Sequence, residues 1–563
     1  MRRLARHAPT AWAVVLAVLL LGPTLGRGYL LTYDMVWVPD LALRPDFLGA
    51  GTALPRAVPS DAVVAVLDEV VPGMLLQKVV LLGALVLGGL GAASLAGRSV
   101  VARLAATSVY VWSPFVVERL GIGHWPLLLC WAVLPWLVRE GARLREDPRV
   151  GVTVPLLLVA GSLSANAGLM TAATLLAVGL TRRNAVRLVP LVLAANAPWL
   201  VAGLLHLDTA TSSSTGAVFG LHAEGPLPAP LAALTLGGIW NAEVVPASRE
   251  TVVLPVVLTL AFVALAAAGY RALADRLGPR TTTALVWLWV AGYAAAVLSW
   301  AAPDAVGSLA ALVPGGGLLR DGTRSLALCA PLTAALVASG VARCAARAPR
   351  PVVAVAGALL PLAFLPDAAW GVSGALRPSA YPDSYAAART ALDDLHDVPD
   401  GDLLVLPFTS YRQPAWNHDR KVLDPLPRYL RPDYVVNDEL VVDRRVIAGE
   451  DPRVPEALAA LAAPTPEARA AALGRLGVAF VARERDVPSG TGYDARIAGT
   501  PVWAGPDLEL LRLDTPVSAR EISGARTAAL AVAWSVFTLL PVLALAGAVR
   551  RTSRSLRRGS TVR

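Results

Sequence analysis

Two carboxylates lie close to the start of the chain, directly after its first apolar segment. Asp34 and Asp40 stand in the stretch YDMVWVPD, with Trp37 between them. A carboxylate between aromatic anchors at a membrane surface could take the proton of a hydroxyl group while a lipid-borne leaving group lies beside it. The alternative is that both aspartates are solvated loop residues without a chemical role.

A second group of polar residues, ERLGIGHW, separates two apolar segments further along the chain. Arg119 could bind a phosphate, because a guanidinium matches phosphate oxygens in a bidentate fork, and His124 could assist it. Trp125 adds an aromatic ring to the same turn. An interfacial belt, in which long side chains extend their polar ends to the lipid headgroups, would explain the same residues.

The motif GGGLLRDGTR precedes another apolar segment. Its two arginines, Arg320 and Arg324, bracket Asp321 after a glycine run and could clamp a phosphate or pyrophosphate near a helix N-terminus. An ion pair that closes the loop is the alternative explanation. Lys78, at the start of the second apolar segment, is a further cation, whose ammonium group would ordinarily reach toward headgroups.

Aromatic residues mark two further candidate contacts. Trp240, in the stretch GGIWN, could offer a surface to a sugar ring or could belong to an amphipathic interfacial segment. The stretch YRQPAWNH, which begins at Tyr411, gathers hydrogen-bonding and aromatic groups and is a candidate glycan contact. The three cysteines lie far apart, within or beside apolar segments, which argues against a disulfide framework and against a zinc site.

The elements that carry these residues are expected to lie in a membrane. The chain has 563 residues, of which 55% are hydrophobic and only 16% are charged, a balance that a soluble domain of this size would not show. The net charge is +9, but the basic residues stand in short clusters between apolar runs. This pattern is typical of membrane topology signals, so membrane lipids are an expected partner and nucleic acid is not.

Apolar segments long enough to cross about 30 Å of hydrocarbon as helices predict about twelve spans. They lie at residues 9–26, 74–97, 100–117, 124–142, 150–163, 166–181, 186–206, 251–273, 281–302, 325–345, 351–370 and 525–549. The fifth and sixth could instead form one long helix. Keeping them separate puts every arginine-rich loop on the same side of the membrane, which is the side where basic residues collect.

This topology predicts a multi-pass protein of the cell membrane with both termini in the cytoplasm. The first apolar segment follows Arg2 and Arg3 and lacks a small-residue cleavage signature, so we expect a retained helix rather than a signal peptide. The basic residues between Arg550 and Arg563 would contact anionic lipids of the inner leaflet.

One long segment, residues 371–524, separates the last two predicted spans and is large enough for a core of its own. Residues 402–408, 478–482 and 508–513 predict short buried strands, and the Ala-rich residues 455–473 predict helix. We therefore predict a transmembrane domain over residues 1–370, a small extracytoplasmic α/β domain over residues 371–524, and a last helix with a basic tail over residues 525–563.

Taken in order along the chain, these features resemble the GT-C fold glycosyltransferases, and within them the membrane part of the large arabinofuranosyltransferases of mycobacterial-type cell walls. The likeness rests on the Asp-containing loop after the first helix and on VPGMLLQK at 71–78, YVWSPF at 110–115, WAVLPW at 131–136 and LRDGTR at 319–324. Asn166 also resembles a family asparagine. These stretches fall within residues 1–345.

The resemblance implies inverting transfer of a sugar from a polyprenyl-phosphate donor to a cell-envelope glycan or lipid acceptor on the extracytoplasmic face. It implies Asp34 as general base, with Asp40 as the alternative. The remaining implied roles are phosphate binding by Lys78, Arg119, His124, Arg320 and Arg324, and contacts to the acceptor or sugar by Trp37, Trp125, Asn166 and Trp240. A divalent cation at the phosphate is the one cofactor considered, and the chain itself is expected to form no metal site.

The chain also departs from that family. Its first-loop aspartate, Asp34, is followed by Met35 and Val36, whereas the family has a small residue and a lysine there. The large carbohydrate-binding modules of the family are replaced by one compact domain.

Two other functions fit the same sequence. A transporter of lipid-linked glycans would need polar residues inside the helical bundle, and the predicted helices are nearly free of charges at mid-depth. A non-catalytic scaffold that keeps the glycosyltransferase fold would use its soluble domain to position an enzyme or a polymer.

Overall fold

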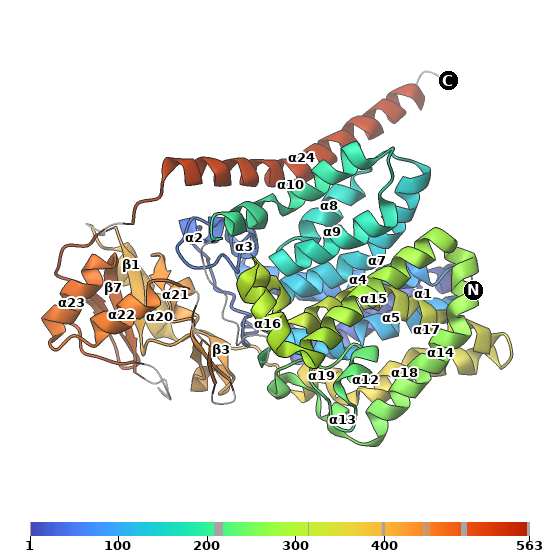
Figure 1. The fold of residues 1–563 in the computed structure, drawn as a ribbon, viewed down its shortest axis with the longest axis horizontal. Helices are drawn as coiled ribbons and strands as arrows, with labels where there is room; N and C mark the ends of the chain where they lie inside the picture. Colours follow the sequence, from blue (N-terminus) through green and yellow to red (C-terminus); the bar gives the residue numbers. More distant parts are fainter. Residues whose placement is uncertain are drawn as a thin grey trace.

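The computed structural model describes residues 2–207, 218–313, 315–396, 400–442, 445–447, 449, 451–485, 493–518 and 520–559. Figure 1 shows a bundle of helices, an α/β part at one side of it, and a long last helix, α24 (Gly524–Gly559), which runs back beside α10 (Ala185–Leu204). The predicted lipid contact of the basic tail rests on side chains of residues 550–563, which lie outside this description.

Eight helical segments in the described chain are long and apolar enough to cross a membrane, as expected for a polytopic helical membrane protein. They are His7–Leu25, Gly73–Leu95, Val100–Gly121, Ala185–Leu204, Val253–Leu277, Pro279–Ala301, Gly322–Ala345 and Gly524–Val549. A further pair, Arg350–Phe364 with Pro366–Ser373, would make a ninth span but is bent by 78°.

The helices of the bundle and its loops have the following bounds. They are α1 (Arg2–Leu21), η1 (Gly22–Leu25), α2 (Pro45–Leu48), α3 (Ser60–Leu67), α4 (Gly73–Leu95), α5 (Val100–Val111), α6 (Pro114–Gly121), α7 (Trp125–Glu146), α8 (Thr153–Gly161), α9 (Ala165–Gly179), α10, α12 (Ala229–Leu234), η2 (Ala242–Val244), α13 (Ala247–Glu250), α14 (Val253–Leu277), α15 (Pro279–Ala301), α16 (Pro303–Leu312), η3 (Gly316–Leu319), η4 (Gly322–Cys329), α17 (Ala330–Ala345), α18 (Arg350–Phe364), η5 (Pro366–Ala368) and α19 (Ala369–Ser373).

Each segment predicted as a span contains helix. Judged by length and composition, however, eight helical segments of the described chain, or nine with the bent pair, could cross a membrane, which is fewer than the twelve or so predicted. The clearest shortfall is α8, whose 9 residues rise only about 14 Å, less than half of the hydrocarbon thickness. The predicted break between α8 and α9 is present at residues 162–164. Ser164 begins α9 by accepting a hydrogen bond from Ala167 N at 3.4 Å.

The α/β part holds a five-stranded mixed sheet in the order β4-β1-β7-β9-β8, in which β4, β1 and β7 are parallel and β9 and β8 antiparallel. Its elements are α20 (Asp383–Asp393), β1 (Asp402–Leu406), β2 (Tyr411–Arg412), η6 (Ala415–Asn417), β3 (Val422–Leu423), α21 (Leu426–Tyr429), β4 (Tyr434–Val435), β5 (Leu440–Val442), β6 (Arg445–Ile447), α22 (Val454–Leu461), α23 (Pro466–Arg475), β7 (Val478–Glu484), β8 (Thr500–Ala504) and β9 (Leu508–Arg512).

The three strands predicted from apolar runs are confirmed as β1, β7 and β9, which lie side by side at the centre of the sheet. The predicted helix over residues 455–473 is two helices, α22 and α23. They separate where Pro464 cannot continue the first and Thr465 caps the second, accepting from Ala468 N at 3.1 Å.

The two faces of the sheet serve different purposes. Because side chains alternate along a strand, Leu404 and Leu406 of β1 pack with α22 and α23 in one apolar cluster. Leu403 and Val405 point to the other face and belong to the same cluster as Trp37 and the helices of the bundle. The α/β part is therefore joined to the membrane part through a shared apolar core.

Polar contacts fix the same junction to the loop between α1 and α4. Arg44 is only 3% exposed and donates to the carbonyl oxygens of Pro427 at 2.9 Å, Arg428 at 3.3 Å and Leu430. Arg428 in turn pairs with Asp61 of α3 at 3.0 Å. These contacts hold α21 against the loop that carries Asp34.

We expect Arg44→Ala to loosen this junction. Three carbonyl groups, two of them buried, would lose a charged donor, so the free energy of local opening should fall by about 3 kcal/mol and amide exchange in α21 should become about 100-fold faster. Hydrogen exchange of the purified full chain measures this. Arg431→Ala is the matched control, because that side chain is 52% exposed and its pairs with Asp40 and Asp393 contribute little. Equal exchange in the two variants would contradict the prediction.

Candidate active site at the first loop

The loop after α1 makes a tight turn at Asp34. Thr32 and Met35 pair across it, with Met35 N donating to Thr32 O at 2.8 Å, and Tyr33 has a positive φ of 41°. A residue other than glycine rarely adopts that conformation, so surrounding contacts must hold it. One such contact comes from the α/β part, because Tyr33 N donates to Lys421 O at 2.8 Å.

A second turn, between α6 and α7, lies directly against the first. Gly123 permits this approach, because it has a φ of 85° and a Cβ there would overlap the backbone of Thr32 and Met35. Asp34 N donates to Ile122 O at 3.2 Å across the contact. The two turns are thereby fixed through their backbones.

Local sequence explains the second turn. Ser113 caps α6 by accepting from Val116 N at 3.4 Å, and Pro114 follows at the first helical position. His124 immediately precedes α7, which has a proline near its start. Arg119 and His124 thus stand five residues apart on the two sides of one turn.

The Asp34 carboxylate contacts side chains from both parts of the protein. Its Oδ2 lies 3.3 Å from His124 Nε2, and its Oδ1 accepts a hydrogen bond from the Tyr411 hydroxyl at 2.6 Å. The Asp34 side chain is nevertheless 43% exposed. The carboxylate therefore has two fixed donors and an open side toward solvent.

His124 is neutral and carries its proton on Nε2. Arg119 Nη1 lies 3.1 Å from His124 Nδ1, and a guanidinium can only donate, so Nδ1 must be the acceptor. Nε2 then donates to Asp34. Burial and the charge of Arg324 lower the pKa of His124 to about 4, despite the opposing hydrogen bond to Asp34.

Asp34 is ionised throughout the physiological range. Its removal from bulk water would raise its pKa, but the hydrogen bonds from His124 and Tyr411 and the charge of Arg324 lower that pKa to about 2. Burial and the nearby Asp34 charge have the opposite effect on Tyr411, whose pKa lies well above its usual range, so its hydroxyl keeps its proton.

Beneath His124 lies a buried ion pair between Arg119 and Asp321, whose side chains are each 1% exposed and whose Nη1 and Oδ2 atoms lie 3.1 Å apart. Arg119 Nη2 also bonds Thr323, whose hydroxyl donates to Asp321 Oδ1 at 2.6 Å. Arg324 Nε donates to Asp321 Oδ2 at 2.9 Å. Burial would raise the pKa of Asp321, but the charges of Arg119 and Arg324 hold it far below its usual range.

Asn166 extends these contacts to α9. With its amide oriented to satisfy both groups, Oδ1 accepts from Arg324 Nη1 at 2.9 Å and Nδ2 donates to Leu318 O at 3.1 Å. The break before α9 places Asn166 in the first turn of that helix.

Side chains from five separate regions of the chain thus form one connected set, which we call the Asp34 network. It consists of Tyr411, Asp34, His124, Arg119, Asp321, Thr323, Arg324 and Asn166. The sequence predicted site roles for Asp34, Arg119, His124, Arg324 and Asn166, and the structure brings these together.

Three members of the network had no assigned role. The sequence shows Asp321 between two arginines and Tyr411 in a candidate glycan contact, but it carries no signal for Thr323. An acidic residue between two arginines beside apolar helices does indicate an ion pair. Nothing in the sequence indicated that Tyr411 reaches Asp34, because 377 residues separate them.

Two predicted residues lie elsewhere in the described structure and have no contact with the Asp34 network there. Asp40 pairs with Arg389 of α20 and with Arg431 at 3.5 Å. Lys78 Nζ donates to Thr24 O at 2.6 Å and to Gly28 O at 2.8 Å. Both fix neighbouring backbone or side chains, and their roles as base and phosphate ligand remain predictions.

Trp37 and Trp125 pack against each other, with ring centroids 5.0 Å apart, three residues after Asp34 and one after His124. They line an apolar pocket of about 230 Å³, whose other walls come from α3, α4, α7 and α8. The indole N–H of Trp37 is buried and has no hydrogen-bond partner in the described residues. The network thus borders an apolar space between helices.

Trp240 is linked to Arg320 through the ring of Phe219. Its ring meets Phe219 edge to face at 4.8 Å, and the Arg320 guanidinium lies 5.1 Å from the centre of the Phe219 ring. The loop that holds Trp240 is fixed by a buried ion pair, Arg249 with Glu224 at 2.5 Å. A contact of Trp240 with sugar remains a prediction.

In the described part of the chain, no group of three or more His, Cys, Asp or Glu side chains is placed to hold a metal ion. Comparison of the chain with protein-family models, with curated proteins and with solved structures finds no match. The geometry of the Asp34 network and the likeness seen in the sequence are what bear on function.

The neutral state of His124 can be tested directly. We expect its ring to keep the Nε2–H tautomer from pH 7 down to pH 5 and to titrate near its pKa of about 4, well below the ordinary 6.5. Nitrogen-15 NMR of histidine-labelled protein measures both, and His124→Gln identifies the resonance. A titration midpoint near 6.5 would contradict the proposed geometry.

The same pKa predicts how stability depends on pH. Between pH 6.5 and about 4, the unfolded chain binds a proton at His124 that the folded chain does not, so stability should fall as pH falls through this window. His124→Gln can keep both hydrogen bonds without titrating. Its unfolding temperature should therefore fall less steeply than that of the wild type below pH 6.5, as measured by thermal melts.

Proposed function

We propose that the protein is a membrane glycosyltransferase that moves a sugar from a polyprenyl-phosphate donor to a cell-envelope glycan or lipid acceptor. The observation that carries the proposal is the open carboxylate of Asp34, which is fixed by His124 and Tyr411 and joined through His124 to the buried Arg119. In this proposal the site faces the outside of the cell and both termini lie in the cytoplasm.

In the proposed reaction, an acceptor hydroxyl attacks the anomeric carbon of the donor sugar from the face opposite the phosphate. The new glycosidic bond forms while the bond from the anomeric carbon to the phosphate oxygen breaks. The phosphate oxygen leaves with the electron pair, and the hydroxyl proton passes to Asp34. The configuration at the anomeric carbon inverts.

With a pKa of about 2, the Asp34 carboxylate is a weak base, but a weak base is sufficient for this step. The acceptor oxygen becomes strongly acidic as it bonds to an electron-poor anomeric carbon, so a weak base can remove its proton late in the reaction. The hydrogen bonds from His124 and Tyr411 keep Asp34 ionised and oriented.

The arginines divide into two groups by exposure. Arg119 is 1% exposed and committed to Asp321, so in this proposal it orients His124 rather than binding phosphate. Arg324 is 23% exposed and Arg320 is half-buried, which leaves both able to meet a phosphate that carries growing negative charge.

The apolar pocket beside Trp37 and Trp125 supports a lipid-borne donor. It is lined almost entirely by carbon and lies between helices α4, α7 and α8. A prenyl chain is apolar, so one end of it could enter such a space and bring the attached phosphate to the neighbouring network.

We expect Asp34→Asn to reduce transfer by about 100-fold to 10,000-fold while the protein stays folded, because the proton acceptor is lost. Tyr411→Phe is the informative companion. It removes one donor to the Asp34 carboxylate and so raises the pKa of Asp34, which should shift the acid limb of the kcat/KM profile to higher pH. Transfer of radiolabelled sugar from polyprenyl-phosphate donors by the purified protein measures both.

A scaffold is the second candidate function, and the two fixed donors to Asp34 favour it, because a strained structural turn could also use two such hydrogen bonds. The two candidates differ in the outcome of Asp34→Asn. If no donor supports transfer, and Asp34→Asn rescues the envelope defect of a deletion strain as well as the wild type does, the catalytic proposal fails.

Filling the apolar pocket should weaken donor binding. Val159→Phe places a ring in the space of about 230 Å³, so KM for the polyprenyl-phosphate donor should rise about tenfold or more with a smaller effect on kcat. Val263→Phe is the matched control, because Val263 is 51% exposed on the outer face of α14. Equal KM values in the two variants would place the lipid elsewhere.

A further inference from the structure

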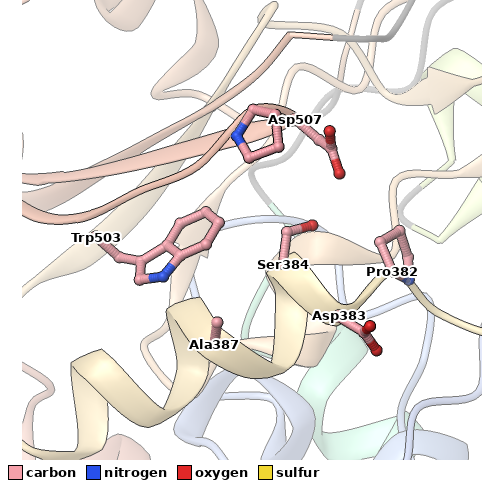
Figure 2. Close-up of a pocket in the computed structure, with 7 residues that line it drawn as sticks. Pro382, Asp383, Ser384, Ala387, Trp503 and Asp507 are labelled. Carbon is pink, nitrogen blue, oxygen red and sulfur yellow. The ribbon is translucent and has the colours of Figure 1, made fainter.

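A second pocket lies in the α/β part, between the start of α20 and the hairpin that joins β8 to β9. It has a volume of about 430 Å³. Figure 2 shows Trp503 and Asp507 on the hairpin side, facing Ser384 and Ala387 on the helix. Neither the sequence motifs nor the Asp34 network involve these residues.

The polar side chains that line this pocket lack hydrogen-bond partners among the described residues. Within the described residues, neither the carboxylate of Asp383 nor that of Asp507 makes a hydrogen bond or ion pair. Ser384 is 8% exposed, and its Oγ is buried without a hydrogen-bond partner. A buried hydroxyl left in this state costs free energy, so a ligand that supplies the missing bond would be favoured.

The indole ring forms the apolar wall. Trp503 is half-buried, and its ring lies over Gly505, where an added Cβ would meet the ring atoms before anything else. The missing Cβ at Gly505 therefore lets the Trp503 ring lie close against this turn. The adjacent turn is closed by Gly505 N donating to Leu508 O at 2.9 Å.

We propose that this pocket binds a neutral oligosaccharide, which, resting on the proposed function, is part of the acceptor. The chemistry of the walls selects this class of ligand. The two carboxylates can accept hydrogen bonds from the hydroxyl groups of a sugar. Their negative charge would repel an anionic ligand. The flat indole suits the carbon-bound hydrogens of a sugar face. The positive end of α20 disfavours a cation, whereas the charge of Arg485, whose Nη1 lies 3.4 Å from Gly505 O, is already paired with Glu509 at 3.3 Å.

The pocket is connected to the loop that carries Asp34. Tyr381 immediately precedes Pro382, which lines the pocket, and its hydroxyl donates to Trp37 O at 2.9 Å. Trp37 stands three residues after Asp34. A glycan chain held at Trp503 would therefore lie against a segment that is hydrogen-bonded to the loop carrying Asp34.

Saturation-transfer NMR and calorimetry of the full chain in lipid nanodiscs test the proposal, with arabinofuranosyl, mannosyl and glucosyl hexasaccharides and methylguanidinium as probes. We expect at least one oligosaccharide to bind, and Trp503→Ala, Gly505→Ala and Asp507→Asn each to weaken it about tenfold or more. Tyr493→Ala, which removes an exposed aromatic ring from the same part of the chain, should leave binding unchanged.

Binding can be separated from transfer. Asp34→Asn should bind the oligosaccharide as the wild type does, even where transfer is lost. Binding that depends on Trp503 without any sugar transfer would leave the pocket assignment standing while the proposed function fails. Binding of methylguanidinium alone, or oligosaccharide binding that survives both Gly505→Ala and Asp507→Asn, would overturn the pocket assignment.

Discussion

The buried ion pair between Arg119 and Asp321 is the interaction on which the rest of the site depends. The two residues are 202 positions apart, and each side chain is 1% exposed. Charges in an apolar bundle are tolerated only when paired, and removing one partner of such a pair costs about 3–5 kcal/mol. The α6–α7 turn and the loop before η4 are therefore held together. His124 and Arg324 attach to this pair, and the orientation of the Asp34 carboxylate follows from His124.

The α/β part completes the same arrangement from the other side. It supplies Tyr411 to the carboxylate and the Lys421 carbonyl to the strained turn. One face of its sheet shares an apolar core with the bundle, and Arg44 fixes the junction. The contacts of the Asp34 carboxylate are therefore complete only when both parts are docked. That coupling gives a physical reason for a compact domain in this position, whether it acts by binding a glycan or by closing the site.

Sequence patterns predicted Asp34, Arg119 and Arg324 because charged residues beside apolar segments are rare and therefore informative. They also predicted the three central strands, since those are buried on both faces and read as continuous apolar runs. Partner choice could not be predicted in the same way. Lys78 and Asp40 have the same residue types as the network members but bond to nearby backbone and to Arg389 instead. Short strands such as β4, with two residues, carry too little pattern to be recognised.

The distance in sequence between Asp34 and its partners also sets an order in time. Asp34 leaves the ribosome long before Tyr411, which follows 377 residues later, a delay of roughly 20–75 s at about 5–20 residues per second. During that interval the first helix and its loop are already in the membrane, but the carboxylate lacks one of its two donors. The nascent chain therefore inserts with the contacts of Asp34 incomplete, and the last long segment between spans to be synthesised is the one that completes them.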